Sequence, residues 1–285
     1  MTLPNRQKIN MKGDMGVSIQ NETVLSGDKP IPLIHYENFG KSFGTLVATK
    51  GVELSIRKGE FVTLVGPSGC GKSTLLNAAA GVFQPTQGAV YYEGASVTGY
   101  NRKVGYMTQS DHLLPWRTVE RNIALPLEIR GLSSAQIRSR VEELIDLVGL
   151  NGFSKSYPSQ LSGGMRKRCA LARVLAYDPE TLLMDEPFGA LDAQLRLAMQ
   201  VELRTLCLKL GKTVVFVTHD LDEAVALADR CVVFSERPGR VRQIMEINLP
   251  RERNLYRLRG DSQYAKLTTS VWALLAPSFE QGEKQ

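Results

Sequence analysis

The chain has 285 residues, of which 43% are hydrophobic and 22% are charged, and its formal net charge is +6 at pH 7. That length allows one large α/β domain or two smaller lobes, and the composition excludes a largely unfolded chain. No apolar run approaches the roughly 18 residues that a membrane-spanning helix needs, and the N-terminus lacks the apolar core of a signal peptide. We therefore expect a cytoplasmic chain that reaches a membrane only through a partner.

The cysteines and the charge argue against two further classes of protein. Four cysteines stand far apart and form no CxxC pair, which suits a reducing compartment and gives no zinc pattern. The mild positive charge is typical of a solvated surface, and no basic stripe with interleaved aromatic residues indicates nucleic-acid binding. We therefore expect no nucleic-acid partner.

The chain begins with a polar segment and continues with β-type segments. Residues 1–30 lack periodicity and predict a flexible tail. Short apolar stretches then alternate with turns, which is the pattern of strands. We predict strands at Leu33–Phe39, Leu46–Ile56 with a break at Gly51, Phe61–Val65, Ala89–Tyr92 and Lys103–Met107.

The stretch from Gly66 to Thr74 fits the phosphate-loop pattern G-x-x-x-x-G-K-[ST]. An apolar strand enters it and a helical run leaves it, so the loop amides and the helix N-terminus can face one anion. Lys72 adds a positive charge for the β- and γ-phosphates, and Ser73 offers a hydroxyl to Mg²⁺. Cys70 is interpreted as a small filler whose free thiol offers a target for inactivating alkylation. The predicted nucleotide-binding residues are Gly66, Pro67, Ser68, Gly69, Cys70, Gly71, Lys72, Ser73 and Thr74.

Helical signals dominate the middle of the chain. Ser133 and Gln136 form a capping box, apolar residues then recur at helical spacing, and Gly149 ends the run. A second α/β section starts near Leu161. We therefore predict an α/β fold with a mostly helical insert at about residues 110–160.

Two compact apolar runs in the second section, Thr181–Met184 and Thr213–Thr218, are typical of buried parallel strands. A helix that stops at Gly211 is predicted between them. The apolar face predicted for this helix consists of Leu195, Met199, Leu203, Leu206 and Leu210.

Asp185 and Glu186 directly follow the first of these runs. Asp185 is predicted to hold Mg²⁺ through water, and Glu186 to orient the attacking water or accept its proton. Solvated acids at a strand edge are the alternative, but the phosphate loop favours the catalytic interpretation. The sequence therefore predicts a site that binds a nucleotide and Mg²⁺ and hydrolyses the nucleotide.

The triplet Ser162-Gly163-Gly164 precedes that strand and opens a helix rich in Arg and Ala. Together with the phosphate loop, it resembles the nucleotide-binding subunit of an ATP-binding-cassette (ABC) transporter over about residues 33–245. The resemblance implies a phosphate-loop NTPase core with a β-rich N-terminal subdomain and a helical insert. It also implies that Ser162, Gly163 and Gly164 face the γ-phosphate held by the phosphate loop of a second ATPase subunit.

Four further residues resemble motif residues of this family, and they occur along the chain in the same order as in the family. Phe43 resembles the aromatic residue that stacks on adenine, with an ordinary strand aromatic as the alternative. Gln109 resembles the glutamine that contacts Mg²⁺ and joins the core to the helical insert. Asp192 resembles the D-loop aspartate and also suits a helix N-cap, and His219 resembles the switch histidine that senses the γ-phosphate. The implied catalytic residues are Glu186, His219 and Gln109, and the implied magnesium ligands are Ser73, Gln109 and Asp185.

Three details narrow the branch of the family: Leu113–Val119, Met165 in place of the usual glutamine, and Ser235–Val241. They resemble importer ATPases of the nitrate, sulfonate and taurine group. The resemblance implies a second ATPase subunit, most simply an identical copy, and integral-membrane permease subunits. An extracytoplasmic solute-binding protein would take part indirectly, and the chain would lie on the cytoplasmic face of the inner membrane.

The predicted organisation has three parts. Residues 1–30 are the tail, residues 31–250 the ABC ATPase domain with its helical subdomain at about 110–165, and residues 251–285 a C-terminal helical extension. An amphipathic pattern that includes Tyr264 and Val271 predicts a helix in the extension. The arginines expected on its solvated or lipid-facing surface are Arg251, Arg253, Arg257 and Arg259.

Three other classes explain less of the sequence. A non-transport ABC ATPase acting on nucleic acid or ribosomes carries a coiled-coil insertion or a second cassette, and neither is present in this sequence. A small-molecule kinase built on a phosphate loop leaves Ser162, Asp192 and His219 without a role. A nucleotide-gated binding module without hydrolysis leaves Glu186 without one.

Overall fold

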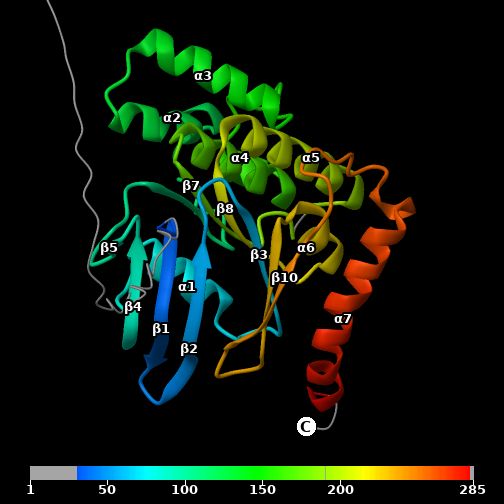
Figure 1. Cartoon of the computed structure of the whole chain (residues 1–285). Helices are drawn as coiled ribbons and strands as arrows, with labels where there is room; N and C mark the ends of the chain where they lie inside the picture. Colours follow the sequence, from blue (N-terminus) through cyan, green and yellow to red (C-terminus); the bar gives the residue numbers. More distant parts are fainter. Residues whose placement is uncertain (1–30, 190, 283–285) are drawn as a thin grey trace, which may run out of the picture. The chain divides into compact units, whose positions relative to one another are not determined.

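The computed structural model describes residues 31–189 and 191–282, in which the strands form two sheets (Figure 1). The tail predicted at residues 1–30 lies outside these ranges. The elements in chain order are β1 (Ile34–Phe43), β2 (Leu46–Ile56), β3 (Phe61–Val65), α1 (Lys72–Ala79), β4 (Gln87–Tyr92), β5 (Ala95–Ser96), β6 (Val104–Met107), α2 (Val119–Ile129), α3 (Ser134–Leu147), the 3₁₀ turn η1 (Pro158–Gln160), α4 (Gly163–Ala176), β7 (Thr181–Asp185), α5 (Ala193–Leu210), β8 (Thr213–Val217), α6 (Leu221–Leu227), β9 (Arg230–Phe234), β10 (Val241–Glu246), the 3₁₀ turn η2 (Leu258–Gly260) and α7 (Ser262–Gly282).

The smaller sheet is antiparallel and has the strand order β2-β1-β4-β5. Buried side chains alternate with exposed ones along its strands, as in a sheet with one covered face. The break expected at Gly51 is wrong, because β2 continues through this residue. Gly51 has a φ of +62°, and the register with β1 shifts between Phe39 and Lys41, so the glycine forms a bulge within a continuous strand.

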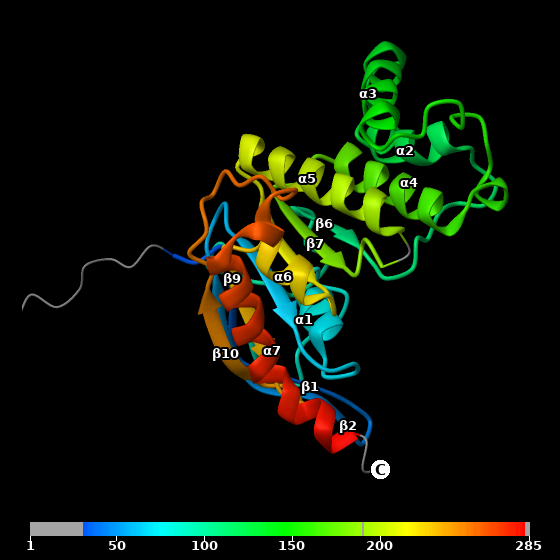
Figure 2. The same ribbon diagram turned by 90° about the vertical axis from the view of Figure 1, so that its right-hand side faces the viewer.

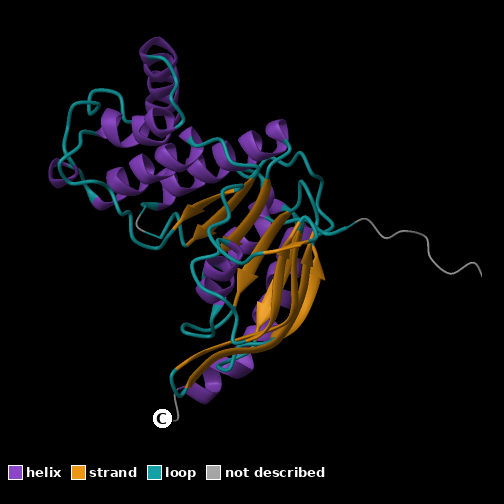
Figure 3. Ribbon diagram, turned by 90° about the vertical axis from the view of Figure 1, so that its left-hand side faces the viewer, coloured by secondary structure: helices purple, strands orange, loops and turns teal. Residues whose placement is uncertain are grey.

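The larger sheet has the order β10-β9-β3-β8-β7-β6, with five parallel strands and β10 antiparallel at one edge. Its central strands are buried along their whole length, because helices and the smaller sheet cover both faces (Figure 3). Val62 and Leu64 of β3 pack in the core shared with β1, β2 and α1. Phe61 and Val65 pack in the core shared with α4, α5 and α6. The predicted α/β core is confirmed.

Helices α2, α3 and α4 contact one another in the chain segment between β6 and β7 (Figure 2). The predicted capping box is confirmed, since Ser133 accepts from the Gln136 amide and the Gln136 side chain accepts from the Ser133 amide. Val141 and Leu144 are buried on the inner face of α3. Within residues 31–189 and 191–282, every helix is too short or too polar to span a membrane.

The apolar face of α5 differs from the prediction at its C-terminal end. Met199 and Leu203 are buried, but Leu210 is 49% exposed. Cys207 is buried instead, because it follows Leu203 by four residues and so lies on the same face. The predicted end of the helix is confirmed by Gly211, which adopts the left-handed conformation at a φ of +61°.

The amphipathic helix predicted near the C-terminus is confirmed as α7, which buries Tyr264 and Val271. The expectation that the preceding arginines face solvent or lipid is wrong for Arg253, whose side chain is only 2% exposed. Its guanidinium donates to the carbonyl oxygens of Val225 and Ala228 at the end of α6. These carbonyls lack partners within their helix, so an inward-pointing arginine satisfies them.

Candidate nucleotide site

The phosphate loop connects the C-terminal end of β3 to the start of α1, as predicted. Three of its glycines have positive φ values: Gly66 at +155°, Gly69 at +73° and Gly71 at +96°. Gly71 is the N-cap of α1, and a Cβ atom there would lie 2.3 Å from the Thr49 side chain. The loop therefore needs glycine both for its backbone conformation and for its close approach to β2.

Lys72 is buried beneath the loop. Its ammonium donates to the carbonyl oxygens of Gly66 at 2.7 Å and Pro67 at 2.9 Å. The same ammonium lies 3.6 Å from the sulfur of Cys70. The positive charge is thus held inside the loop, at the N-terminus of α1, where helix dipole and lysine both favour an anion.

The Cys70 thiol is a filler, as interpreted from the sequence. Its side chain is 1% exposed, and burial raises its pKa despite the neighbouring Lys72. Alkylation requires an accessible thiolate. The alkylation expected at Cys70 is therefore disfavoured, because the thiol is buried and its pKa is raised.

Asp185 ends β7 beside Ser73, which hydrogen-bonds to its carboxylate. Burial raises the pKa of Asp185, while the bond from Ser73 and the charge of Lys72 lower it. A hydroxyl and a carboxylate are oxygen donors of the kind that Mg²⁺ uses beside phosphate oxygens and water. The described residues hold no cluster of three or more His, Cys, Asp or Glu side chains suited to a metal.

Glu186 directly follows β7, and its carboxylate contacts residues that follow two other strands. One carboxylate oxygen lies 3.3 Å from Nδ1 of His219, which follows β8, and the other accepts from Nε2 of Gln109, which follows β6, at 3.4 Å. The backbone of Glu186 has a φ of +48°, and its amide donates to the carbonyl of Val217. A non-glycine residue in this region is strained, and Glu186 keeps this conformation with its carboxylate in contact with both partners.

A cavity of about 450 Å³ contains most of the predicted residues. Phe43 lies at its edge, half-exposed, with its ring edge-on to Phe83 at a centroid distance of 5.5 Å. Four of the lining residues were not predicted from the sequence, and of these only Arg237 carries a charge. The lining residues are Phe43, Leu46, Ala48, Ser68, Gly69, Gly71, Lys72, Ser73, Thr74, Gln109, Asp185, Glu186, Val217, His219 and Arg237.

The residues predicted to act across a subunit interface do not line this cavity. Ser162 is exposed and caps α4, since its hydroxyl accepts from the Met165 amide at 3.2 Å. Asp192 is likewise exposed and caps α5 by accepting from the Leu195 amide at 3.0 Å. The N-cap role was predicted for Asp192, whereas for Ser162 the sequence predicted only its place at a helix start. Contact of these residues with a nucleotide stays a prediction.

Comparisons with known proteins identify a family and several similar chains. The family model described as "ABC transporter" matches residues 49–189. The aliphatic sulfonates import ATP-binding protein SsuB of Bacillus thuringiensis is 43% identical over 244 residues, which cover 86% of this chain and 93% of that protein. The nitrate import ATP-binding protein NrtC of Synechococcus elongatus is 46% identical over 233 residues, covering 80% of this chain and 35% of that protein.

Solved structures of one cassette are also similar. The dimeric structure of MJ0796, described as a bacterial ABC transporter cassette, has a TM-score of 0.71 and is 34% identical, covering 76% of this chain and all of that one. Its dimeric post-hydrolysis state bound to ADP and Pi has a TM-score of 0.70 and is 33% identical over the same shares. The chain belongs to the ABC transporter family and is one of its nucleotide-binding ATPases.

Proposed function

We propose that this chain is the ATP-hydrolysing subunit of an ABC importer. The observation that carries the proposal is the convergence of Glu186, His219 and Gln109 beside Lys72 in one cavity. A carboxylate positioned by two neighbours at the end of a phosphate-binding loop suits attack of water on a γ-phosphate. Ser162 lies outside that cavity, on an exposed helix start, where it is available to a second subunit.

In this proposal the loop amides and Lys72 bind the β- and γ-phosphates of ATP. Ser73, Asp185 and Gln109 would hold Mg²⁺, which supplies positive charge to the phosphate oxygens. Glu186 accepts the proton of the attacking water, and His219 orients Glu186 while contacting the γ-phosphate. Phe43 lies beside the adenine. Preorganised charges and dipoles provide most of the stabilisation of the transition state.

Two subunits would close around two ATP molecules, so that Ser162, Gly163 and Gly164 of one copy contact the γ-phosphate held by the other. Asp192 would lie at the same interface. The dimeric arrangement of the similar MJ0796 cassette supports this proposal. Hydrolysis would remove the shared γ-phosphate contact, and the pair would then reopen. Homodimers are the simplest symmetric arrangement.

The importer branch is supported by the similarity to sulfonate and nitrate import proteins. We propose a small solute, such as nitrate, a sulfonate or taurine, that an extracytoplasmic binding protein delivers to membrane permease subunits. The ATPase would be peripheral on the cytoplasmic side of the inner membrane. Gln109 joins the core to the helical segment, and Lys167 of α4 donates to its carbonyl. This contact would transmit motion at the nucleotide to the permease.

The proposed organisation follows from these roles. Residues 31–250 would form the ATPase domain, and about residues 110–165 its permease-facing helical subdomain. Residues 251–285 would form a C-terminal extension. Residues 1–30 remain assigned to a tail only by their sequence.

The variant Glu186→Gln tests the catalytic part of the proposal. It removes the proton acceptor but retains the shape, so ATP should still bind and hold the two copies together while hydrolysis falls by about 100-fold or more. Light scattering with and without ATP, combined with phosphate release, measures both effects. Normal turnover in this variant would remove Glu186 from the proposed role.

The transport part is tested separately. Affinity purification of the chain from its own membranes should recover a polytopic permease, and ligand identification on the associated binding protein should give a small solute. Purification of the chain with ribosomes or nucleic acid instead would contradict the importer assignment.

A further inference from the structure

His219 lies in a short connection between β8 and α6, so its position depends on α6. Asp220, the next residue, caps α6 by accepting from the Glu223 amide at 3.1 Å. Thr218, the preceding residue, donates to the buried carboxylate of Glu223 at 2.6 Å. Both neighbours of His219 are therefore bonded to the first turn of this helix.

Helix α6 has only seven residues. A helix this short is not stable by itself in water, so contacts with the rest of the protein determine where it lies. It carries no charged residue in its last turn that would satisfy its terminal carbonyls. The position of α6, and with it that of His219, must come from surrounding elements.

The C-terminal segment (residues 251–282) contacts the beginning of α6. The Tyr264 hydroxyl of α7 donates to the Asp222 carboxylate at 2.7 Å and lies 3.3 Å from the Asp222 carbonyl. Tyr264 is 6% exposed, while Asp222 lies on the exposed side of α6. The bond therefore joins a fixed residue of α7 to the turn that follows His219.

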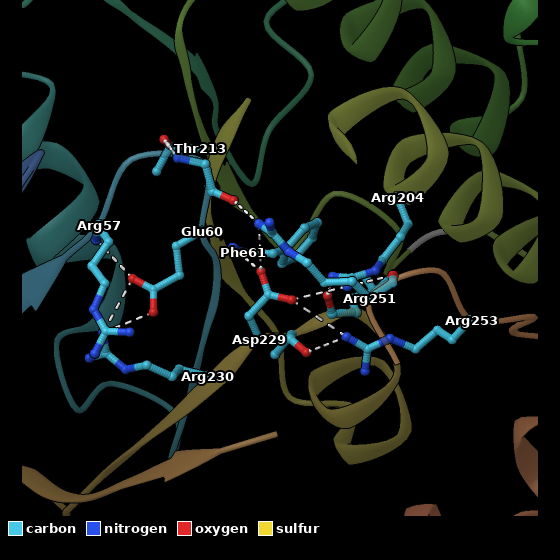
Figure 4. Close-up of polar contacts among 12 residues, drawn as sticks. Arg57, Glu60, Phe61, Arg204, Thr213, Asp229, Arg230, Arg251 and Arg253 are labelled. Carbon is cyan, nitrogen blue, oxygen red and sulfur yellow. Dashed lines mark hydrogen bonds and ion pairs between the residues drawn. The ribbon is translucent and has the colours of Figure 1, made fainter. Parts of the chain in front are cut away.

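The same segment contacts the end of α6. Arg253 donates to the carbonyls of Val225 and Ala228, the latter at 2.7 Å, and lies 3.6 Å from the Asp229 carboxylate. Arg204 of α5 adds bonds to Leu227 and Asp229. Figure 4 shows these guanidiniums gathered around Asp229. Burial lowers the pKa of Arg253 to about 10. Because a buried charge is unfavourable unless it is paired, the contacts with the carbonyls and with Asp229 keep this guanidinium in place.

We propose that the C-terminal segment positions His219 against Glu186, with Tyr264 and Arg253 as the positioning residues. The inference rests on the proposed role of His219. The segment fixes both ends of α6, and α6 fixes the residues on either side of the histidine. Arg196 extends the same network, since it contacts Asp220 at 3.3 Å and the Leu191 carbonyl beside Asp192. The extension would thereby set the rate of hydrolysis without touching the nucleotide.

The variant Tyr264→Phe tests this inference, because it removes one hydroxyl and retains the packing of the ring. Water can replace the lost bond at the exposed Asp222, so the fold should survive. We expect kcat for ATP hydrolysis to fall by about 3- to 10-fold, while the Kd for ATP stays within twofold of the parent. Tyr256→Phe is the matched control, since Tyr256 is exposed and its hydroxyl has no hydrogen-bond partner among the described residues.

A double-mutant cycle separates positioning from general destabilisation. In a His219→Ala background, single-turnover hydrolysis should be insensitive to Tyr264→Phe, because the residue to be positioned is absent. The inference would be overturned if Tyr264→Phe lowered the hydrolysis rate by the same factor in the parent and in the His219→Ala background. A normal kcat in Tyr264→Phe would overturn it as well.

Arg253→Lys provides a second, independent variant. It keeps the charge but cannot donate to two carbonyls with a planar group, so we expect it to lower kcat and spare ATP binding in the same way. A normal kcat in a folded Arg253→Lys protein would count against the inference. If His219→Ala itself hydrolyses ATP normally, the proposed function fails; if only the Tyr264 and Arg253 variants are normal, the inference alone fails.

Discussion

Arg237 lies at the edge of the nucleotide cavity, in the turn between β9 and β10. Its guanidinium has no hydrogen bond or ion pair with another residue of the described ranges. The sequence motif around it indicated a branch of the family but no role, because nothing local shows that this turn folds back onto the phosphate loop. A free cation beside an anion-binding loop is positioned to interact with a nucleotide.

Arg237→Ala should therefore raise the KM for ATP by about 3- to 10-fold, and raise it less at high salt, with kcat within twofold of the parent. Steady-state hydrolysis at two ionic strengths measures the effect. Arg240→Ala, on the same turn but outside the cavity, is the control. Equal behaviour of the two variants would mean that Arg237 makes no contact with the nucleotide.

The reactivity of Cys70 follows from its environment. Because burial raises its pKa, the thiolate fraction at neutral pH is smaller than that of a free cysteine and increases as the pH rises. We expect alkylation of Cys70 by iodoacetamide to be slower than that of free cysteine at pH 7, and to accelerate towards pH 9. Peptide mass spectrometry measures the site and rate, and rapid modification at pH 7 would contradict the buried position.

At the scale of elements, the turn between β9 and β10 supports the phosphate loop directly. The Gly239 amide donates to the Ala48 carbonyl at 2.9 Å, and the Gly239 carbonyl accepts from Lys50. A Cβ atom on Gly239 would lie 1.8 Å from the carbonyl oxygen of Cys70. The turn and the phosphate loop therefore cannot both keep their positions if this glycine acquires a side chain.

We expect Gly239→Ala to weaken ATP binding by about 10-fold or more and to lower stability by about 1–3 kcal/mol, since overpacking displaces backbone. Isothermal titration and thermal unfolding measure the two effects. Gly260→Ala is the matched control, because apart from its chain neighbours and its own helical turn no atom lies within 4 Å of the added Cβ. Parent-like ATP affinity in Gly239→Ala would show that the loop tolerates the displacement.

The elements also show what sequence reasoning can reach. Strand β3, the cap of α3 at Ser133 and the end of α5 at Gly211 were predicted, because their signals lie within a few residues. The continuity of β2 through Gly51 and the burial of Arg253 were not, because each depends on a partner distant in the sequence. The loop, carboxylates and histidine of the site were found by motif, whereas Arg237 reaches the cavity only through tertiary contacts.

At the scale of the whole molecule, one copy of the chain carries both halves of the proposed composite site in separate places. Lys72 lines the cavity, and Ser162 does not. If two copies exchange these halves, each nucleotide contacts residues of both. Variants in different halves should then compensate for one another when mixed.

Mixing Lys72→Ala with Ser162→Arg tests this exchange. Each variant alone should be inactive, but a mixed dimer combines the intact loop of one copy with the intact Ser162 region of the other. With random pairing, about a quarter of all sites are complete, and phosphate release should rise accordingly. No recovery in a mixture shown to contain mixed dimers would mean that the site is contained within one chain.

The exposed position of Ser162 has a further consequence for dilute enzyme. If catalysis requires an encounter between copies, the turnover measured per molecule cannot be constant. It should increase with the amount of enzyme in the assay and level off once association is complete, so that the hydrolysis rate reports a dissociation constant. Tethering to a permease would remove this dependence, because it replaces free diffusion by a high local concentration.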